Sequence, residues 1–236
     1  MSNSVDVEKM RESILKIRKK IEAAAEKSGR NPDDILLLGV TKTVDVDAMQ
    51  AAFDLGIKDF GENRVQEFVK KSDIINRECR WHIIGRLQTN KVKYLDNRIS
   101  LIHSLDRLKL AEALDKRGKI IDYVFPVLVQ VNVSGESTKA GIEPENLKNF
   151  LLQISKMGNI KVKGLMTIAP YTEDSEAVRY VFRNLKQLAV DIDRERLENI
   201  SMEELSMGMS GDYETAIEEG STIVRIGSAI FGERIY

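Results

Sequence analysis

The sequence has 236 residues, 42% of them apolar and 31% charged, and this length suits one (β/α)₈ barrel of about 250 residues or two small domains. Its formal net charge of −1 argues against binding to nucleic acid or to an anionic membrane, and no apolar run approaches the roughly 20 residues of a membrane span. Cys79 is the only cysteine and residues 1–30 lack the apolar core of a signal peptide, so we expect a cytoplasmic protein without intrachain disulfides.

An amphipathic helix is predicted near the beginning of the chain. Within residues 5–27, apolar side chains recur three or four positions apart, at Val7, Met10, Ile14, Ile17 and Ile21. This spacing places them on one face of an α-helix. We expect residues 1–30 to pack on the barrel as an extra N-terminal helix, within a single domain that spans residues 1–236.

Short apolar runs then alternate with helical patterns along the rest of the chain. The eight predicted strands are residues 35–40, 57–60, 81–84, 101–103, 124–133, 162–166, 200–205 and 223–226. The seven helical patterns between them are residues 46–55, 64–77, 88–96, 107–117, 143–157, 174–192 and 212–219. Such alternation favours a parallel sheet covered by helices, and eight units predict a closed (β/α)₈ TIM barrel. An open doubly wound sheet is the alternative, but the glycine-rich turn that typically follows its first strand is replaced here by Thr41, Lys42 and Thr43.

Lys42 lies at the exit of the first predicted strand, which is short, branched and apolar. We expect this lysine to have little access to bulk water. Burial disfavours the charged ammonium form, and the neutral amine is the form that attacks a carbonyl to make a Schiff base. A lysine that extends from a strand end to the surface is the structural alternative.

Two glycine- and serine-rich segments follow the last two predicted strands. They are residues 206–211 and 225–229, and each leads directly into a helical or turn-forming pattern. Glycine permits close approach of the backbone to a ligand, and unpaired N–H groups at a helix start attract anions. Because barrels frequently bind phosphate in the loops after strands seven and eight, the pair predicts a phosphate site. The alternative is two ordinary turns.

A Schiff-base lysine together with a phosphate site suggests a phosphorylated aldehyde, and pyridoxal 5′-phosphate (PLP) is the obvious candidate. Arg225 could face the ring nitrogen of PLP. Because a guanidinium only donates hydrogen bonds, it would meet an unprotonated ring nitrogen and weaken the ring as an electron sink. The alternative for Arg225 is an ion pair with Glu62 or Asp212.

The chain also resembles a known family, the pyridoxal phosphate homeostasis proteins, which are single-domain relatives of the alanine racemase barrel. The matching segments are VTKT at 40–43, FGENRVQE at 60–67, WHIIGRLQTNK at 81–91, IHSLD at 102–106, QVNV at 130–133, GLMTI at 164–168, LSMGMSGDY at 205–213 and RIGSAIFG at 225–232. They occur in order over almost the whole chain, so the resemblance is close.

The resemblance implies a barrel that holds PLP as a Schiff base on Lys42, with the ring nitrogen on Arg225. It also implies phosphate contacts from Ser210, Gly227 and Ser228, and it places Asn63, Ser206 and Met207 beside the cofactor. Whether the hydroxyl of Ser206 or that of Ser210 reaches the phosphate stays open at this stage.

The remaining candidates support no other chemistry. His82 and His103 could act as bases, but packing with one hydrogen bond explains each equally well. Two histidines, one cysteine and scattered carboxylates show no metal-ligand spacing.

Two main hypotheses about activity follow. In the first, the protein is not an enzyme but holds, buffers or delivers PLP, with apo PLP-dependent enzymes as candidate recipients. In the second, it is a PLP-dependent amino-acid racemase, which needs an acid/base group on each face of the substrate α-carbon. The resemblance implies that racemases use a second domain and a tyrosine of the partner subunit. This sequence shows no such domain, so we favour the carrier and expect a monomer. A PLP-free Schiff-base aldolase on the same fold is a third possibility.

Overall fold

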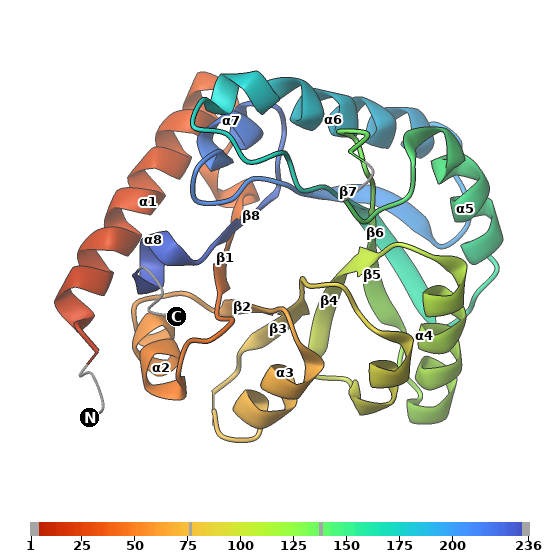
Figure 1. The fold of residues 1–236 in the computed structure, drawn as a ribbon, viewed down its shortest axis with the longest axis horizontal. Helices are drawn as coiled ribbons and strands as arrows, with labels where there is room; N and C mark the ends of the chain where they lie inside the picture. Colours follow the sequence, from red (N-terminus) through yellow and green to blue (C-terminus); the bar gives the residue numbers. More distant parts are fainter. Residues whose placement is uncertain (1–4, 76, 137–138, 233–236) are drawn as a thin grey trace.

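The computed structural model describes residues 5–75, 77–136 and 139–232 and confirms the predicted barrel. Eight parallel strands pair in chain order and close between β1 and β8 (Figure 1). The strands are β1 (Leu36–Val40), β2 (Asp59–Glu62), β3 (Arg80–Ile83), β4 (Ile99–Leu105), β5 (Phe125–Gln130), β6 (Ile160–Met166), β7 (Ile200–Ser206) and β8 (Ile223–Ile226). We call the carboxyl-terminal ends of these strands the upper rim and their amino-terminal ends the lower end.

Helices surround the strands (Figure 1). They are α1 (Val7–Lys27), α2 (Val46–Asp54), α3 (Val65–Ser72), α4 (Leu108–Ile121), α5 (Leu147–Ile154), α6 (Arg179–Asp193), α7 (Tyr213–Glu218) and α8 (Ser228–Phe231). The sequence did not predict α8. The α-helix predicted at residues 88–96 is instead a 3₁₀ helix over Thr89–Tyr94, because this short segment of Thr, Asn and Val has low α-helical propensity.

The apolar core has two layers. The larger layer lies between the strands and the helices, and its fully buried members include Phe60, Phe125 and Phe182. The smaller layer fills the barrel itself and consists of Leu38, Leu101, Leu128, Met166 and Ile223. Because successive strand residues point to opposite faces, β1, β4, β5, β6 and β8 contribute residues to both layers.

Helix α1 forms as its sequence pattern predicts. Asp6 caps it by accepting a 3.0 Å hydrogen bond from the Lys9 N–H, and its apolar face is buried. It packs against α7 and α8, which come from the far end of the sequence (Figure 1). Two ion pairs to α7 reinforce this contact, Lys20–Glu214 at 2.6 Å and Lys27–Glu218 at 2.7 Å. The helix therefore covers the β1–β8 side of the barrel, where the chain closes on itself.

No helix within the described residues is long and apolar enough to cross a membrane.

Candidate functional site

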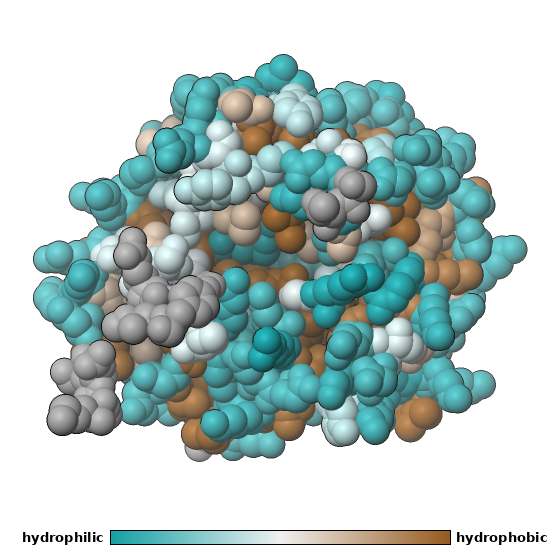
Figure 2. Space-filling view, viewed as in Figure 1, coloured by the Kyte–Doolittle hydropathy of each residue, from teal (hydrophilic) through white to brown (hydrophobic). Residues whose placement is uncertain are grey.

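The upper rim gathers most of the residues that the sequence singled out. The expected lysine follows β1, the two glycine- and serine-rich segments follow β7 and β8, and β1 pairs directly with β8. Figure 2 shows the molecule in space-filling form from the same side as Figure 1. Hydrophilic residues cover most of its periphery, and hydrophobic residues are visible toward its centre.

Lys42 lies in the turn between β1 and α2. The next residue, Thr43, has a φ of 66°, a left-handed conformation that a non-glycine residue rarely adopts. Lys42 itself is half-buried, so the expectation that it has little access to bulk water is wrong. Within the described part of the chain, its Nζ makes no hydrogen bond and no ion pair. The amine is therefore free to bind a ligand.

A buried ion pair fixes the backbone beside Lys42. The Lys71 Nζ lies 2.8 Å from Glu62 Oε1 and donates a 2.7 Å hydrogen bond to the Thr41 carbonyl. The Thr41 hydroxyl donates a 2.6 Å bond to the same Glu62 oxygen. Burial raises the pKa of Glu62, while hydrogen bonds from Lys71 and Thr41 oppose the increase. This pairing means that Glu62 neutralises Lys71 rather than Arg225.

Arg225 lies inside the barrel at the end of β8, only 5% exposed. Its Nη1 donates a 2.5 Å hydrogen bond to the Ser206 hydroxyl, and its Nη2 donates a 2.9 Å bond to the Thr167 carbonyl. Desolvation lowers the pKa of Arg225 to about 10, and the charge of Asp212 opposes this shift. Among the described residues no carboxylate pairs with Arg225, which contradicts the ion-pair alternative. A guanidinium has five N–H donors, so this one retains donors for a ligand.

The loops after β7 and β8 form an anion nest, which we define as the N–H and hydroxyl groups of Ser210, Gly211, Ser228 and Ala229. The hydroxyls of Ser210 and Ser228 lie 3.4 Å apart. Within the described residues, none of these four N–H groups donates a backbone hydrogen bond. Asp212 shapes the first loop by accepting a 2.6 Å bond from the Met209 N–H. Unpaired N–H groups beside two hydroxyls are a suitable environment for a phosphate.

A close backbone contact joins the nest to the strand that carries Lys42. A Cβ atom on Gly227 would lie 3.3 Å from both the Cβ and the carbonyl oxygen of Val40, a tight contact that glycine avoids. Val40 is the last residue of β1, two positions before the lysine. The fold therefore places the lysine turn and the anion nest on adjacent strands.

The other predicted site residues take different positions. Asn63 follows β2 and is half-buried, and its backbone lies so close to Gly85 that a Cβ there would collide with it. Met207 is fully buried in the layer between strands and helices, and its carbonyl accepts a 2.7 Å bond from the Ser221 hydroxyl. Its side chain thus has a packing role. The Ser206 hydroxyl is also buried and is bound to Arg225.

The sequence did not connect the two histidines to this site. His103 Nδ1 lies 2.8 Å from the Ser206 hydroxyl, and its Nε2 lies 2.9 Å from His82 Nδ1. His82 Nε2 in turn lies 3.1 Å from Asp59 Oδ1. The signal was the two-residue alternation along the strands, which places His103 on the same face as the interior residue Leu101. In the described part of the chain, no three His, Cys, Asp or Glu side chains form a potential metal site.

The fold and the rim together define a closed (β/α)₈ barrel with a free lysine after its first strand and an anion nest after its last two. The family of the alanine racemase N-terminal domain matches residues 13–235. A curated relative from Aquifex aeolicus, named pyridoxal phosphate homeostasis protein, is 49% identical over 226 residues, covering 95% of this chain and 98% of the relative. The chain belongs to the alanine racemase N-terminal domain family and, within it, to the pyridoxal phosphate homeostasis proteins.

Two solved structures place this assignment in context. PipY of Synechococcus elongatus, solved with PLP bound, superposes with a TM-score of 0.82 at 29% identity. The match covers 94% of this chain and 100% of the PipY chain. Alanine racemase of Clostridium difficile superposes with a TM-score of 0.72 at 16% identity, covering 97% of this chain and 57% of the racemase. The second similarity shows the shared fold alone.

Proposed function

We propose that this protein binds PLP at the upper rim and holds it for cellular PLP homeostasis, rather than using it for catalysis. One observation carries the proposal: the groups left unpaired at the rim match the two ends of PLP. Lys42 offers an amine with no partner among the described residues, and the anion nest offers hydroxyl and N–H groups. The names of the relatives and the PLP-bound PipY structure support the same ligand.

The residues present fit PLP at three points. PLP, when bound, would supply an aldehyde, and the Lys42 amine could condense with it to a covalent C=N link with release of water. The anion nest holds the phosphate. Arg225, which keeps spare N–H donors inside the barrel, donates to the ring nitrogen. An arginine at this position leaves the ring nitrogen unprotonated, which suits storage better than catalysis.

The structure favours Ser210 over Ser206 as the phosphate hydroxyl. Ser206 is fully buried, and its hydroxyl already contacts both Arg225 and His103. Ser210 instead lies beside Ser228 at the surface of the nest. Ser206 therefore supports Arg225, and Ser210 joins Gly227 and Ser228 at the phosphate.

The placement of the two histidines supports a carrier rather than a racemase. A racemase needs an acid/base group on each face of the substrate α-carbon. Lys42 can serve one face. His82 and His103 are 4% and 0% exposed and are bound to each other inside the barrel, so neither is free to serve the second face.

Reconstitution tests PLP binding directly. We expect the protein to stay yellow after it is mixed with PLP and then freed of unbound PLP by desalting, and borohydride followed by peptide mass analysis to locate the cofactor on Lys42. A desalted protein that is colourless and unmodified at Lys42 would refute the binding proposal.

Isotope exchange separates the carrier from the racemase. PLP-loaded protein incubated with single-enantiomer amino acids in deuterated water should show no steady exchange at the α-carbon. Sustained exchange would instead support the racemase. Titration of apo PLP-dependent enzymes with loaded protein tests delivery, and light scattering tests the proposed monomer.

A further inference from the structure

A continuous chain of polar side chains runs through the barrel from the upper rim to the lower end. We define this polar chain as Arg225, Ser206, His103, His82, Asp59 and Arg80. Its successive contacts are 2.5 Å, 2.8 Å, 2.9 Å and 3.1 Å from Arg225 to Asp59. Arg80 then binds both oxygens of Asp59, at 2.7 and 2.5 Å. One hydrogen-bonded path thus connects the proposed partner of the PLP ring with the opposite end of the barrel.

The two ends of the polar chain fix the direction of every hydrogen bond within it. At the lower end, bonds from His82 and Arg80 hold the pKa of Asp59 below its usual value against the effect of burial, so its carboxylate only accepts. His82 must then donate through Nε2 and accept at Nδ1, and His103 must do the same. At the upper end, Arg225 only donates, so the Ser206 hydroxyl accepts from it and donates to His103 Nδ1.

The lower and upper ends impose the same direction on the hydrogen bonds. All the bonds of the polar chain form together only when both histidines are neutral with the proton on Nε2. An added proton on His103 would place a donor against the Ser206 hydroxyl. The hydroxyl would then have to turn, and its contact with Arg225 would change. Desolvation, together with the neighbouring positive charge of Arg225, lowers the pKa of His103 well below its usual value, which keeps this ring neutral.

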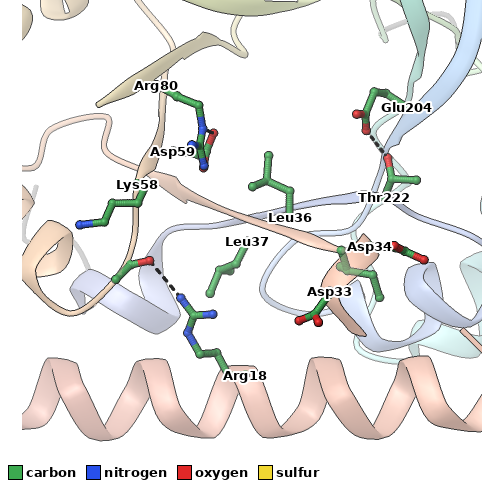
Figure 3. A pocket seen from close by; sticks show the side chains of 12 residues that line it. Arg18, Asp33, Asp34, Leu36, Leu37, Lys58, Asp59, Arg80, Glu204 and Thr222 are labelled. Carbon is green, nitrogen blue, oxygen red and sulfur yellow. Dashed lines mark hydrogen bonds and ion pairs between the residues drawn. The ribbon is translucent and has the colours of Figure 1, made fainter. Parts of the chain in front are cut away.

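The lower end of the polar chain reaches a surface cavity. Figure 3 shows Asp59 and Arg80 in its lining, opposite Leu36 and near Arg18 of α1. The cavity has a volume of about 420 Å³. Asp59 can therefore respond to the solvent there, although it is only 3% exposed. The other charged groups that line this cavity are Asp33, Asp34, Lys58 and Glu204.

We propose that Asp59, His82, His103 and Ser206 are positioning residues for Arg225. They orient the Ser206 hydroxyl so that its oxygen accepts a hydrogen bond from the Arg225 guanidinium. In this way the contacts at the lower end of the barrel control the strength of the hydrogen bond that Arg225 would donate to the PLP ring nitrogen. The inference rests on the proposed function, because it takes Arg225 as the partner of the ring nitrogen. Leu38, Leu101 and Leu128 occupy interior positions next to the polar chain, so apolar side chains could also have filled this part of the barrel. A buried polar network is stabilising when its members are hydrogen-bonded to one another, as these six residues are.

Histidine NMR tests the polar chain without PLP. The protein has only two histidines, so ¹⁵N-histidine labelling reports on His82 and His103 alone. We expect the neutral rings of both histidines in the apo protein to be Nε2–H tautomers. Asp59→Asn should disturb both tautomers, because an amide can donate to His82 and reverse the direction of the polar chain. Nδ1–H tautomers in the unmodified protein would overturn the proposal.

The PLP-loaded protein tests whether the chain acts through Arg225. We expect Asp59→Asn and His82→Leu to speed PLP release at least about five-fold and to shift the absorbance maximum of the Lys42-bound cofactor. His82→Gln keeps one donor and one acceptor, so it should restore release to within about two-fold. The matched control is Asp96→Asn. It removes a carboxylate that pairs with Arg98 and that is not part of the polar chain.

The outcomes separate this inference from the proposed function. If the unmodified protein fails to bind PLP, the proposed function fails, while the histidine tautomers still test the polar chain. If PLP binds but His82→Leu releases it at the unmodified rate with unchanged absorbance, the positioning role is wrong. If Asp59→Asn does not fold, the His82→Leu and His82→Gln pair decides the question alone.

Discussion

The two ends of the barrel differ in how their polar groups are paired. At the lower end, Arg80 holds both oxygens of Asp59, and Thr222 donates a 2.6 Å hydrogen bond to Glu204. At the upper rim, Lys42 and the anion nest keep unpaired donors within the described residues. Paired groups hold the fold together, whereas unpaired donors that reach solvent remain available to a ligand. The comparison therefore supports the upper rim as the proposed ligand site.

A surface cavity offers a second candidate for a ligand site. The cavity of about 420 Å³ lies at the lower end, between α1 and the barrel (Figure 3). Its cations already have partners there: Arg18 donates 3.0 Å to the Gly56 carbonyl, and Lys58 donates 2.9 Å to the Phe53 carbonyl. The cavity is also lined by four carboxylates, those of Asp33, Asp34, Asp59 and Glu204, which oppose the binding of an anionic ligand.

The largest expected effect comes from removing the amine at the upper rim. Lys42→Ala should abolish the covalent link to PLP completely, because no other group at the rim is proposed to attack the aldehyde. Some PLP should remain bound through the anion nest. Borohydride trapping measures the link and equilibrium dialysis measures the remaining PLP.

Lys58→Ala, at the lower end, is the matched control and should keep the link intact. Complete loss of noncovalent PLP from the Lys42 variant would show that the nest contributes little.

Replacing one arginine at each end sharpens the comparison further. Arg225→Met should weaken PLP binding about 10- to 100-fold and lower the free energy of unfolding less than Arg80→Met does, because it removes a buried charge without a carboxylate partner and leaves only the Ser206 hydroxyl and the Thr167 carbonyl without their donor. Arg80→Met should instead lower the free energy of unfolding by about 1–3 kcal/mol, because it strips an ion-pair partner from buried Asp59.

PLP titration and urea unfolding of both variants measure these effects. Equal destabilisation by the two substitutions would remove the distinction drawn between paired and unpaired arginines.

A smaller effect is expected from the hydroxyls of the anion nest. Ser210→Ala and Ser228→Ala should each weaken PLP binding about 3- to 10-fold, since each removes one hydrogen bond to a charged phosphate. The absorbance of the bound cofactor should not change, because neither hydroxyl is placed near the ring. Ser155→Ala, whose hydroxyl donates 3.0 Å to the Leu152 carbonyl after α5, is the control. An unchanged affinity in both nest variants would exclude this phosphate position.

The smallest effect concerns pH and the buried histidine. Because desolvation and the charge of Arg225 lower the folded-state pKa of His103, the unfolded chain binds more protons below about pH 6.5. The free energy of unfolding should therefore fall as the pH drops from 6.5 to 5.5, by up to about 1.4 kcal/mol. His103→Gln should reduce this slope, which urea unfolding at pH 7.5, 6.5 and 5.5 measures. The same slope in both proteins would contradict the assignment.

Much of the barrel followed from the sequence because apolar runs report burial directly. Strand β8 was predicted at residues 223–226, as observed, since all four residues are buried. The run at residues 57–60 was placed two residues early relative to β2. Ile57 is 1% exposed but lies outside the strand, because burial alone does not require strand pairing.

The rim residues could be predicted because parallel topology brings all strand ends to one face. The polar chain could not, since it depends on which interior side chains meet across β2, β3, β4, β7 and β8. Strand register sets those contacts. It brings Leu38 opposite Arg225 and Gly61 opposite His82, pairings that no local pattern encodes.

Helix α1 has a consequence for how the protein is made. Lys20 contacts Glu214, a residue 194 positions later in the chain, so the helices that cover α1 emerge from the ribosome long after it. Until then, the apolar face of α1, formed by Met10, Ile14, Ile17 and Ile21, is exposed to water in the growing polypeptide. The later segments that cover α1 are also the ones that carry the proposed phosphate site.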